Sequence, residues 1–463
     1  MLKRHQGLVR NPTLRRVTAA ALAGLVLVPA AAAAHGVVQR PDLPIPEWLF
    51  GWAAGVVLLV SFLALAVLWP EPKLERARWR PLPGALGRTL GSRALEAVCA
   101  VAGVALLALV VVAGLAGTQS PLNNFAPTFI FIVFWVGMVF ASALLGNVFA
   151  AFSPWRSLGR FGRERRPYPD WLGRWPAAVG LLAFTWIELV SGWSEEPRML
   201  AFAVLGYTAA TLAAQSVYGT EAWTRRGEAF AVYFGLFASI SPFERREGVV
   251  GVRRPLAGLS RLDPAPGTVA LLAVMIGTVT FDGLSQGRLW LDLTADMGEG
   301  VEKAAATLGL LASVVLVGGF YALGVAGARS VGGDLSAERL RRGFVHSLVP
   351  IAMAYVAAHY LTFLVLEGQA IVYLVSDPLG EGWNLLGSAA AAIDYGVLSQ
   401  NQAWYLQVGF VVAGHVSALV LAHDRALVLY PGSRHAVRSQ YWMLGVMMGF
   451  TTLALWLLAT AQG

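Results

Sequence analysis

The chain has 463 residues, of which 57% are hydrophobic and 13% are charged, so it has too little polar surface to coat several water-soluble domains. Its formal net charge of +8 would suit a nucleic-acid-binding protein, but the basic residues follow the pattern of a membrane protein, and we expect no nucleic-acid partner. A single cysteine, Cys99, excludes an internal disulfide, an all-cysteine zinc site, a cysteine-ligated iron–sulfur cluster and CxxCH haem attachment.

Residues 1–34 have the three parts of a secretory signal peptide. A basic stretch precedes the apolar run from Val17 to Ala30, and Ala31 to Ala34 supply an A-x-A cleavage site. Cleavage there would leave His35 as the first residue of a single membrane domain, 35–463. Two interpretations of His35 stay open: an incidental first residue, or a metal ligand whose free amine and imidazole chelate copper. An uncleaved first helix is the alternative to cleavage.

Ten apolar segments follow, most of them about 20 residues long, which is the length that crosses a ~30 Å hydrocarbon core. The segments are 47–69, 94–117, 128–150, 176–193, 198–216, 267–285, 304–328, 344–374, 402–430 and 441–460. A further stretch, 229–241, is too short to span and has arginines on both sides, which predicts a re-entrant or surface-lying half-helix. The fold class predicted is all-α: a polytopic bundle of about ten transmembrane helices plus one half-helix, with the lipid bilayer as its partner.

The distribution of basic residues predicts the orientation of this bundle. If the amino terminus lies outside, the inner loops hold 26 Lys and Arg residues, counting Arg425 at the inner end of its helix, the outer segments hold four and the signal peptide holds five. This asymmetry is the positive-inside rule. We therefore expect a multi-pass protein of a bacterial inner membrane, with both the amino and the carboxyl terminus outside the cytoplasm.

One short sequence occurs twice. FAAFSPWR at 149–156 resembles FASISPFE at 237–244, and in both copies a proline would stop a helix at the cytoplasmic face while a serine satisfies freed backbone groups. Two interpretations stay open: an internal duplication, and chance similarity between two helix ends.

An ionisable residue in the middle of a span costs about 2.5–3.5 kcal/mol on insertion scales and is a functional candidate by default. The candidates in this chain are Glu96, Glu188, Asp282, His359, Glu367, His415 and His423. If consecutive antiparallel helices pack together, His359 and His415 should lie at the same level. Glu188, Asp282 and Glu367 should then gather in the outer half of the membrane.

Two imidazoles with nearby carboxylates would suit a divalent transition metal such as zinc, iron or copper. His359 and His415 are the leading metal ligands, with His35 and His423 as weaker candidates; Glu367, Asp282 and Glu188 are candidate ligands or general bases. A bound metal would lower the pKa of its water to about 7 and supply hydroxide for ester hydrolysis. Other interpretations stay open: polar residues that only hold helices together, one b-type haem between His359 and His415, and a metal-ion or small-solute permease.

Five stretches resemble bacterial membrane proteins labelled fenitrothion hydrolase. They are AHGVVQRPDLPIPEWLF at 34–50, NVFAAFSPWR at 147–156, TFDGLSQ at 280–286, AGHVSALVLAHDRAL at 413–427 and RSQYWMLGV at 438–446. The resemblance implies hydrolysis of an aryl organophosphate with release of a phenol. The leading hypothesis is therefore a metal site around His359 and His415 that activates water against a small apolar phosphate ester.

Overall fold

The computed structural model describes residues 47–160, 165–331, 335–430 and 432–461. The predicted signal peptide and the candidate ligand His35 lie outside the described residues.

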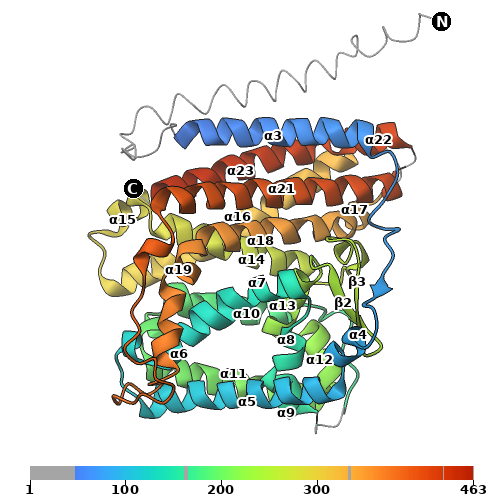
Figure 1. Ribbon diagram of the computed structural model, residues 1–463. Helices are drawn as coiled ribbons and strands as arrows, with labels where there is room; N and C mark the ends of the chain where they lie inside the picture. The colour runs from blue at the N-terminus through green and yellow to red at the C-terminus, as the bar shows by residue number, and fades with distance from the viewer. Residues whose placement is uncertain (1–46, 161–164, 332–334, 431, 462–463) are drawn as a thin grey trace, which may run out of the picture.

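Long helices run side by side through the molecule, and most of the loops that connect them lie at its two ends (Figure 1). These helices are α3 (Glu47–Leu68), α5 (Arg93–Ala116), α10 (Trp175–Leu189), α11 (Pro197–Tyr218), α14 (Thr268–Ser285), α16 (Glu299–Arg329), α18 (Leu348–His359), α21 (Gln400–Leu429) and α23 (Tyr441–Ala461). A further rod consists of α6 (Phe125–Thr128), the π-helical segment η2 (Phe129–Gly137) and α7 (Met138–Leu145).

The shorter elements complete the chain. The helical ones are α4 (Leu86–Leu90), η1 (Pro121–Asn123), α8 (Phe149–Phe152), α9 (Pro154–Gly159), η3 (Trp193–Glu195), α12 (Thr220–Arg226), α13 (Ala229–Ala238), η4 (Leu259–Arg261), α15 (Arg288–Thr294), α17 (Ala337–Phe344), η5 (Val345–Ser347), α19 (Leu361–Val365), η6 (Glu367–Ala370), α20 (Ile371–Leu374), η7 (Tyr395–Val397) and α22 (Ser433–Ser439). The strands are β1 (Arg80–Pro81), β2 (Phe243–Arg246) and β3 (Val249–Val252).

The structure confirms a helical, multi-pass membrane architecture. Within the described residues, seven helices are long and apolar enough to cross a membrane, and the number is eight if the bent pair Ala337–His359 and Leu361–Leu374 counts as one span. Helix α10 has 15 residues and is shorter than a full span. Each of the ten predicted segments contains helix, but a count of ten spans, like the orientation of the termini, stays a prediction.

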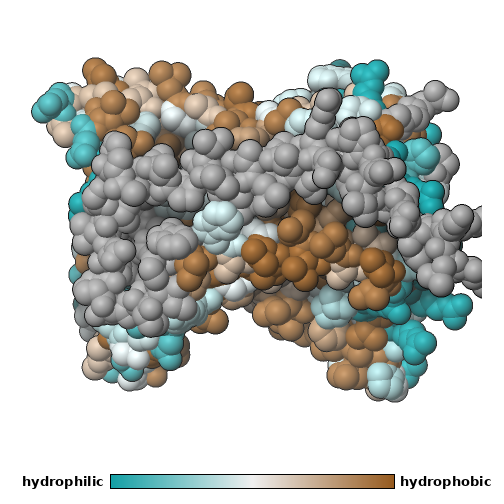
Figure 2. Space-filling view, turned by 90° about the horizontal axis from the view of Figure 1, so that it is seen from above, coloured by the Kyte–Doolittle hydropathy of each residue, from teal (hydrophilic) through white to brown (hydrophobic). Residues whose placement is uncertain are grey.

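Burial differs sharply among the spanning helices. In α14, 78% of the apolar window is buried inside the protein, against 22% in α3 and in α11. The peripheral helices therefore present apolar side chains outward, and Figure 2 shows brown, apolar residues across the middle of one face with teal, hydrophilic residues toward its ends. An apolar surface of this kind is consistent with contact with a lipid bilayer. The high burial of α14 identifies it as the central helix of the bundle.

The short segment at 229–241 forms α13, which is enclosed by other helices and does not lie on the surface. Eight of its ten residues are buried. The Glu228 carboxylate begins the helix by accepting hydrogen bonds from the amides of Phe230 (2.9 Å) and Ala231 (2.8 Å), which satisfies the first turn inside an apolar setting. Ser241 follows its end, and the Ser241 hydroxyl donates to the Leu144 carbonyl at 3.0 Å. Whether α13 and the similar stretch 149–156 reflect a duplication stays a prediction.

A small antiparallel sheet, absent from the all-α prediction, closes the end of the molecule that carries α4, α12, α17 and α22 (Figure 1). The strand order is β1-β3-β2, and Phe243 pairs with Val252. The hairpin turn has positive φ at Glu247 (48°) and Gly248 (79°), the backbone that matches the twist of two paired strands. Glu96 of α5 forms an ion pair with Arg245 of β2 (3.0 Å), which fixes the sheet to α5, and a second with Arg156 of α9 (3.1 Å), so Glu96 has a structural role.

Candidate functional site

A carboxylate, an imidazole and a phenol meet beside the last turn of α14. Asp282 is 6% exposed, and its Oδ2 lies 2.9 Å from His359 Nε2 and 2.8 Å from the Tyr360 hydroxyl, which donates to it. Its other oxygen, Oδ1, accepts a hydrogen bond from Gln286 Nε2 at 2.8 Å. The carboxylate is thus held on both oxygens, and the His359 ring is oriented by it.

The break between α18 and α19 lets two consecutive residues reach the same carboxylate. In a continuous helix, neighbouring side chains point about 100° apart and do not share a partner. Here α18 ends at His359, Tyr360 leaves the helical conformation (φ −96°, ψ 12°), and the chain bends by 59° before it continues in α19. The two rings then contact each other edge to face, with centroids 4.7 Å apart. The bend therefore creates the site.

A second acidic residue lies next to this group. Glu188, near the end of α10, is close enough to Asp282 and to Tyr233 of α13 for their charges to interact. Its Oε2 is buried and forms no hydrogen bond with any residue the structure describes. Tyr233 stacks on Trp135 of η2, with ring centroids 4.5 Å apart. Since a buried oxygen without a partner is costly, Glu188 is a natural place for a proton, a cation or a water molecule.

His415 belongs to another level of the bundle. Helices α18 and α21 pack directly together, and a Cβ added at Gly414 would lie 2.3 Å from the Ala354 Cβ, so Gly414 sets the register. His359 is five residues beyond Ala354, which displaces it by roughly 8 Å along the helix axis. His415 is fully buried, and its Nδ1 lies 2.8 Å from the Val411 carbonyl of its own helix.

The expected pairing of the two imidazoles is therefore not what the structure shows. A metal or a haem bound by His359 and His415 together stays a prediction, and it would require α18 to slide along α21. Within the described residues, no group of three or more His, Cys, Asp or Glu side chains is arranged to hold a metal ion.

The remaining candidates lie apart from Asp282. Glu367 begins η6, where the exposed Tyr395 hydroxyl donates to it at 3.4 Å. His423 has both ring nitrogens in use: Nε2 lies 3.0 Å from the Trp69 carbonyl, and Nδ1 lies 3.2 Å from Gln440 Nε2. These contacts give His423 a structural role at the basic end of α21.

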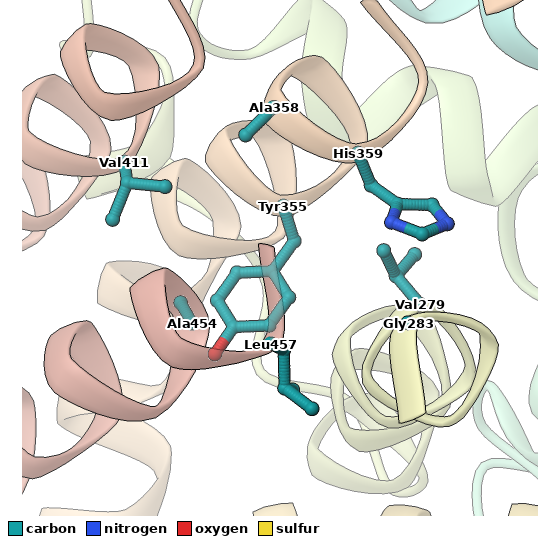
Figure 3. A pocket seen from close by; sticks show the side chains of 8 residues that line it. All are labelled: Val279, Gly283, Tyr355, Ala358, His359, Val411, Ala454 and Leu457. Atoms are coloured by element: carbon teal, nitrogen blue, oxygen red, sulfur yellow. The ribbon is translucent and has the colours of Figure 1, made fainter. Parts of the chain in front are cut away.

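A small pocket opens beside the His359 ring. It is lined by Val279, Gly283, Tyr355, Ala358, His359, Val411, Ala454 and Leu457, from α14, α18, α21 and α23. Figure 3 shows the imidazole near Val279 and Gly283, and the Tyr355 ring extending toward Ala454. Apart from these two polar side chains the lining is apolar, so a molecule in the pocket would meet His359 in an environment with little water.

Sequence reasoning missed three polar partners of this region: Tyr360, Gln286 and Tyr355. Gln286 was detectable, because it lies four residues after Asp282 and therefore on the same face of α14. Tyr360 was not, because only the helix break brings it to Asp282. Tyr355 was detectable as the residue one turn before His359.

Comparisons of this chain with protein-family models, with characterised proteins and with solved structures find no match. The assignment of function therefore rests on the geometry above.

Proposed function

We propose that this membrane protein is a permease for protons or small cations, and that Asp282 and His359 form its ion-binding site. The observation that carries the proposal is a carboxylate–imidazole contact of 2.9 Å buried at a break in a membrane-spanning helix. Ionisable groups at such a depth are expensive to insert, and proton relays and ion paths are their usual purpose.

The surrounding backbone supports this assignment. Permeases commonly build their sites from discontinuous helices, since irregular backbone within the membrane is tolerated where it lines a polar path. Here the broken α18–α19 span, the ten-residue α13 and the 15-residue α10 all meet around Asp282 and Glu188. Segment η2, which packs Trp135 on Tyr233, is π-helical, and π-helical turns often occur at functional sites.

The chemistry of the group suits reversible ion binding. When His359 is protonated, its Nε2–H faces an ionised Asp282 and the pair is neutral overall; when the proton leaves, Asp282 keeps the hydrogen bonds of Tyr360 and Gln286. A cation could replace the proton, because Asp282 and Glu188 are close enough for their charges to interact and Glu188 Oε2 has no hydrogen-bond partner within the described residues.

The proposal is tested with purified protein in liposomes that enclose a pH-sensitive dye. A potassium gradient with valinomycin imposes a membrane potential, and Mn²⁺ or Zn²⁺ with a metal-sensitive dye serves as the cation probe. Asp282→Asn and His359→Gln should each abolish the flux that the wild type supports. Asp292→Asn and His435→Gln, which change exposed residues, are the matched controls. Equal flux in wild type and Asp282→Asn would refute the proposal.

A second candidate is the hydrolase that the resemblance implies. Its supporting observation is that His359, held by Asp282, lines an apolar pocket, an arrangement in which an imidazole can act as a general base toward water. Turnover of an aryl phosphotriester in detergent, with metal analysis of wild type and His359→Gln, tests it. Turnover that persists in His359→Gln would exclude this role for the imidazole.

A further inference from the structure

Two buried polar atoms lie between the Asp282–His359 pair and the basic end of the bundle. They are the Tyr355 hydroxyl on α18 and Nε2 of His415 on α21, and neither forms a hydrogen bond of standard geometry within the described residues. The Thr280 side chain lies close enough to interact with the Tyr355 hydroxyl, and the Thr280 hydroxyl itself donates to the Ile276 carbonyl at 2.9 Å. Tyr355 is 5% exposed and His415 is 0% exposed, so bulk solvent does not reach either.

The hydrogen-bonding state of His415 can be assigned from its contacts. Only a protonated Nδ1 can donate to the Val411 carbonyl at 2.8 Å, so in the neutral ring Nε2 is an acceptor. Tyr355 offers a hydroxyl donor. The unused acceptor on His415, which costs about 1–3 kcal/mol if left unpaired, and the Tyr355 hydroxyl, whose contact with Thr280 falls outside standard hydrogen-bond geometry, are together complementary to a bound water.

Their positions continue the pocket at His359. Tyr355 and His359 are one helical turn apart on α18 and line the same pocket, which Val411 completes from α21. His415 is one turn further along the buried stripe of α21 that contains Val411. The order from the site is therefore His359, the pocket, Tyr355 and then His415 (Figure 3 shows the first three).

We propose that Tyr355 and His415 bind internal water and carry the proton between the Asp282–His359 pair and the basic end of the bundle. The inference rests on the proposed function, because it supplies the route to the ion-binding site. A proton leaves Nδ1 of protonated His359 for a water in the pocket. That water passes a proton to the Tyr355 oxygen while the Tyr355 hydroxyl proton moves, through a second water, to His415 Nε2. Each oxygen ends neutral and the charge resides on His415.

Other ionisable groups border the route. Asp282 and Glu188 face its outer end, and His346 of η5, His423 and Arg425 lie toward the basic end. Arg425 forms an ion pair with Glu75 at 2.9 Å, and both side chains are partly exposed (20% and 23%) at this end of α21.

The first test detects the water itself and does not need transport. Pulsed X-ray radiolysis oxidises side chains beside bound water, so Tyr355 should be oxidised faster than Tyr207, whose hydroxyl donates to Glu228 and accepts from the Ala229 amide. Ala454→Val, which fills the pocket without changing a polar group, should slow the oxidation of Tyr355 but not of the exposed Tyr405. Oxidation of Tyr355 as slow as that of Tyr207 would overturn the inference.

The second test follows proton flux in the liposome assay. Tyr355→Phe and His415→Gln should each lower the flux by about tenfold or more, because each removes one proton carrier. Tyr405→Phe and His435→Gln are the controls. Full flux in both variants, with no flux in Asp282→Asn, would overturn the route and leave the permease intact. A wild type without flux would instead refute the permease, and the radiolysis result would still decide the water site.

Discussion

At the scale of single residues, Asp424 is a buried acid in the spanning helix α21 that has a purely structural role. Its carboxylate accepts hydrogen bonds from Trp69 Nε1 (2.9 Å) and from the amides of Lys73 (2.6 Å), Leu74 (3.2 Å) and Glu75 (3.2 Å). The loop after α3 is thereby fixed to α21. The surroundings of Asp282 differ, because its partners are the imidazole of His359 and the hydroxyl of Tyr360, and both of these groups can exchange protons.

Replacing Asp424 by alanine should leave several donors without an acceptor. We expect the free energy of unfolding to fall by about 3 kcal/mol, and the melting temperature in detergent to fall with it. Asp292→Asn on the exposed face of α15 should melt like the wild type. An Asp424→Ala protein with an unchanged melting temperature would show that the loop does not depend on this carboxylate.

Glu75 in the same loop should make stability depend on pH. Burial is the largest cause that raises the pKa of Glu75 above its ordinary value, while the Arg425 charge opposes the shift. The folded state thus binds the proton more tightly than the unfolded state, so this contribution to stability is full below about pH 4.3 and is lost as the pH rises through the folded-state pKa.

The substitution Glu75→Gln mimics the protonated side chain. Its melting temperature relative to wild type should therefore rise as the pH increases from about 4.3 to neutrality. Glu71→Gln, at an exposed carboxylate of the same loop, is the control. A relative melting temperature that falls over this range would mean that the ion pair with Arg425 outweighs burial.

At the scale of elements, helix register decides which predicted residues meet. The sequence places His359 and His415 each near the middle of its apolar segment, which suggests one level for both. The structure separates them, because the contact of Gly414 with Pro350 and Ala354 fixes the register and because α18 stops at His359. Neither a close backbone approach nor a 59° bend is encoded in hydrophobic periodicity, so residue counting could not find them.

The close contact at Gly414 can be tested directly. A Cβ at this position would lie 2.3 Å from the Ala354 Cβ and 2.7 Å from the Pro350 carbonyl oxygen, so Gly414→Ala should force α18 and α21 apart and cost about 1–3 kcal/mol. Gly409 is on the same helix with nothing within 4 Å, and Gly409→Ala should be tolerated. Equal melting temperatures of the two variants would contradict the register described here.

At the scale of the whole molecule, hydropathy was the most informative property of the sequence. Each of the ten apolar segments contains helix, and the short stretch at 229–241 forms a ten-residue helix that is buried and does not lie on the surface. The site was predictable only in part: Glu188, Asp282 and His359 were candidates and lie together, whereas Glu367 and His415 lie elsewhere. The sequence shows that each of these ionisable residues lies in an apolar segment. Packing between helices that are distant in the sequence decides which of the residues are in contact.

The predicted orientation places the basic end of the bundle in the cytoplasm. Single cysteines in a Cys99→Ala background test it, with a membrane-impermeant maleimide applied to intact spheroplasts. Glu381→Cys, in the loop after α20, should be labelled, and Arg339→Cys, on α17, should be labelled only after lysis, since both positions are exposed. The reverse pattern would invert the topology and the direction of the proposed route.

The most direct test of the central claim is the proton flux of wild type and Asp282→Asn, measured side by side in liposomes under the same imposed potential. The permease account predicts flux in the wild type and a loss on the order of a hundredfold in Asp282→Asn, with Asp292→Asn unchanged. Flux that survives in Asp282→Asn would contradict the account, because the ion would then cross without the carboxylate on which the whole site converges.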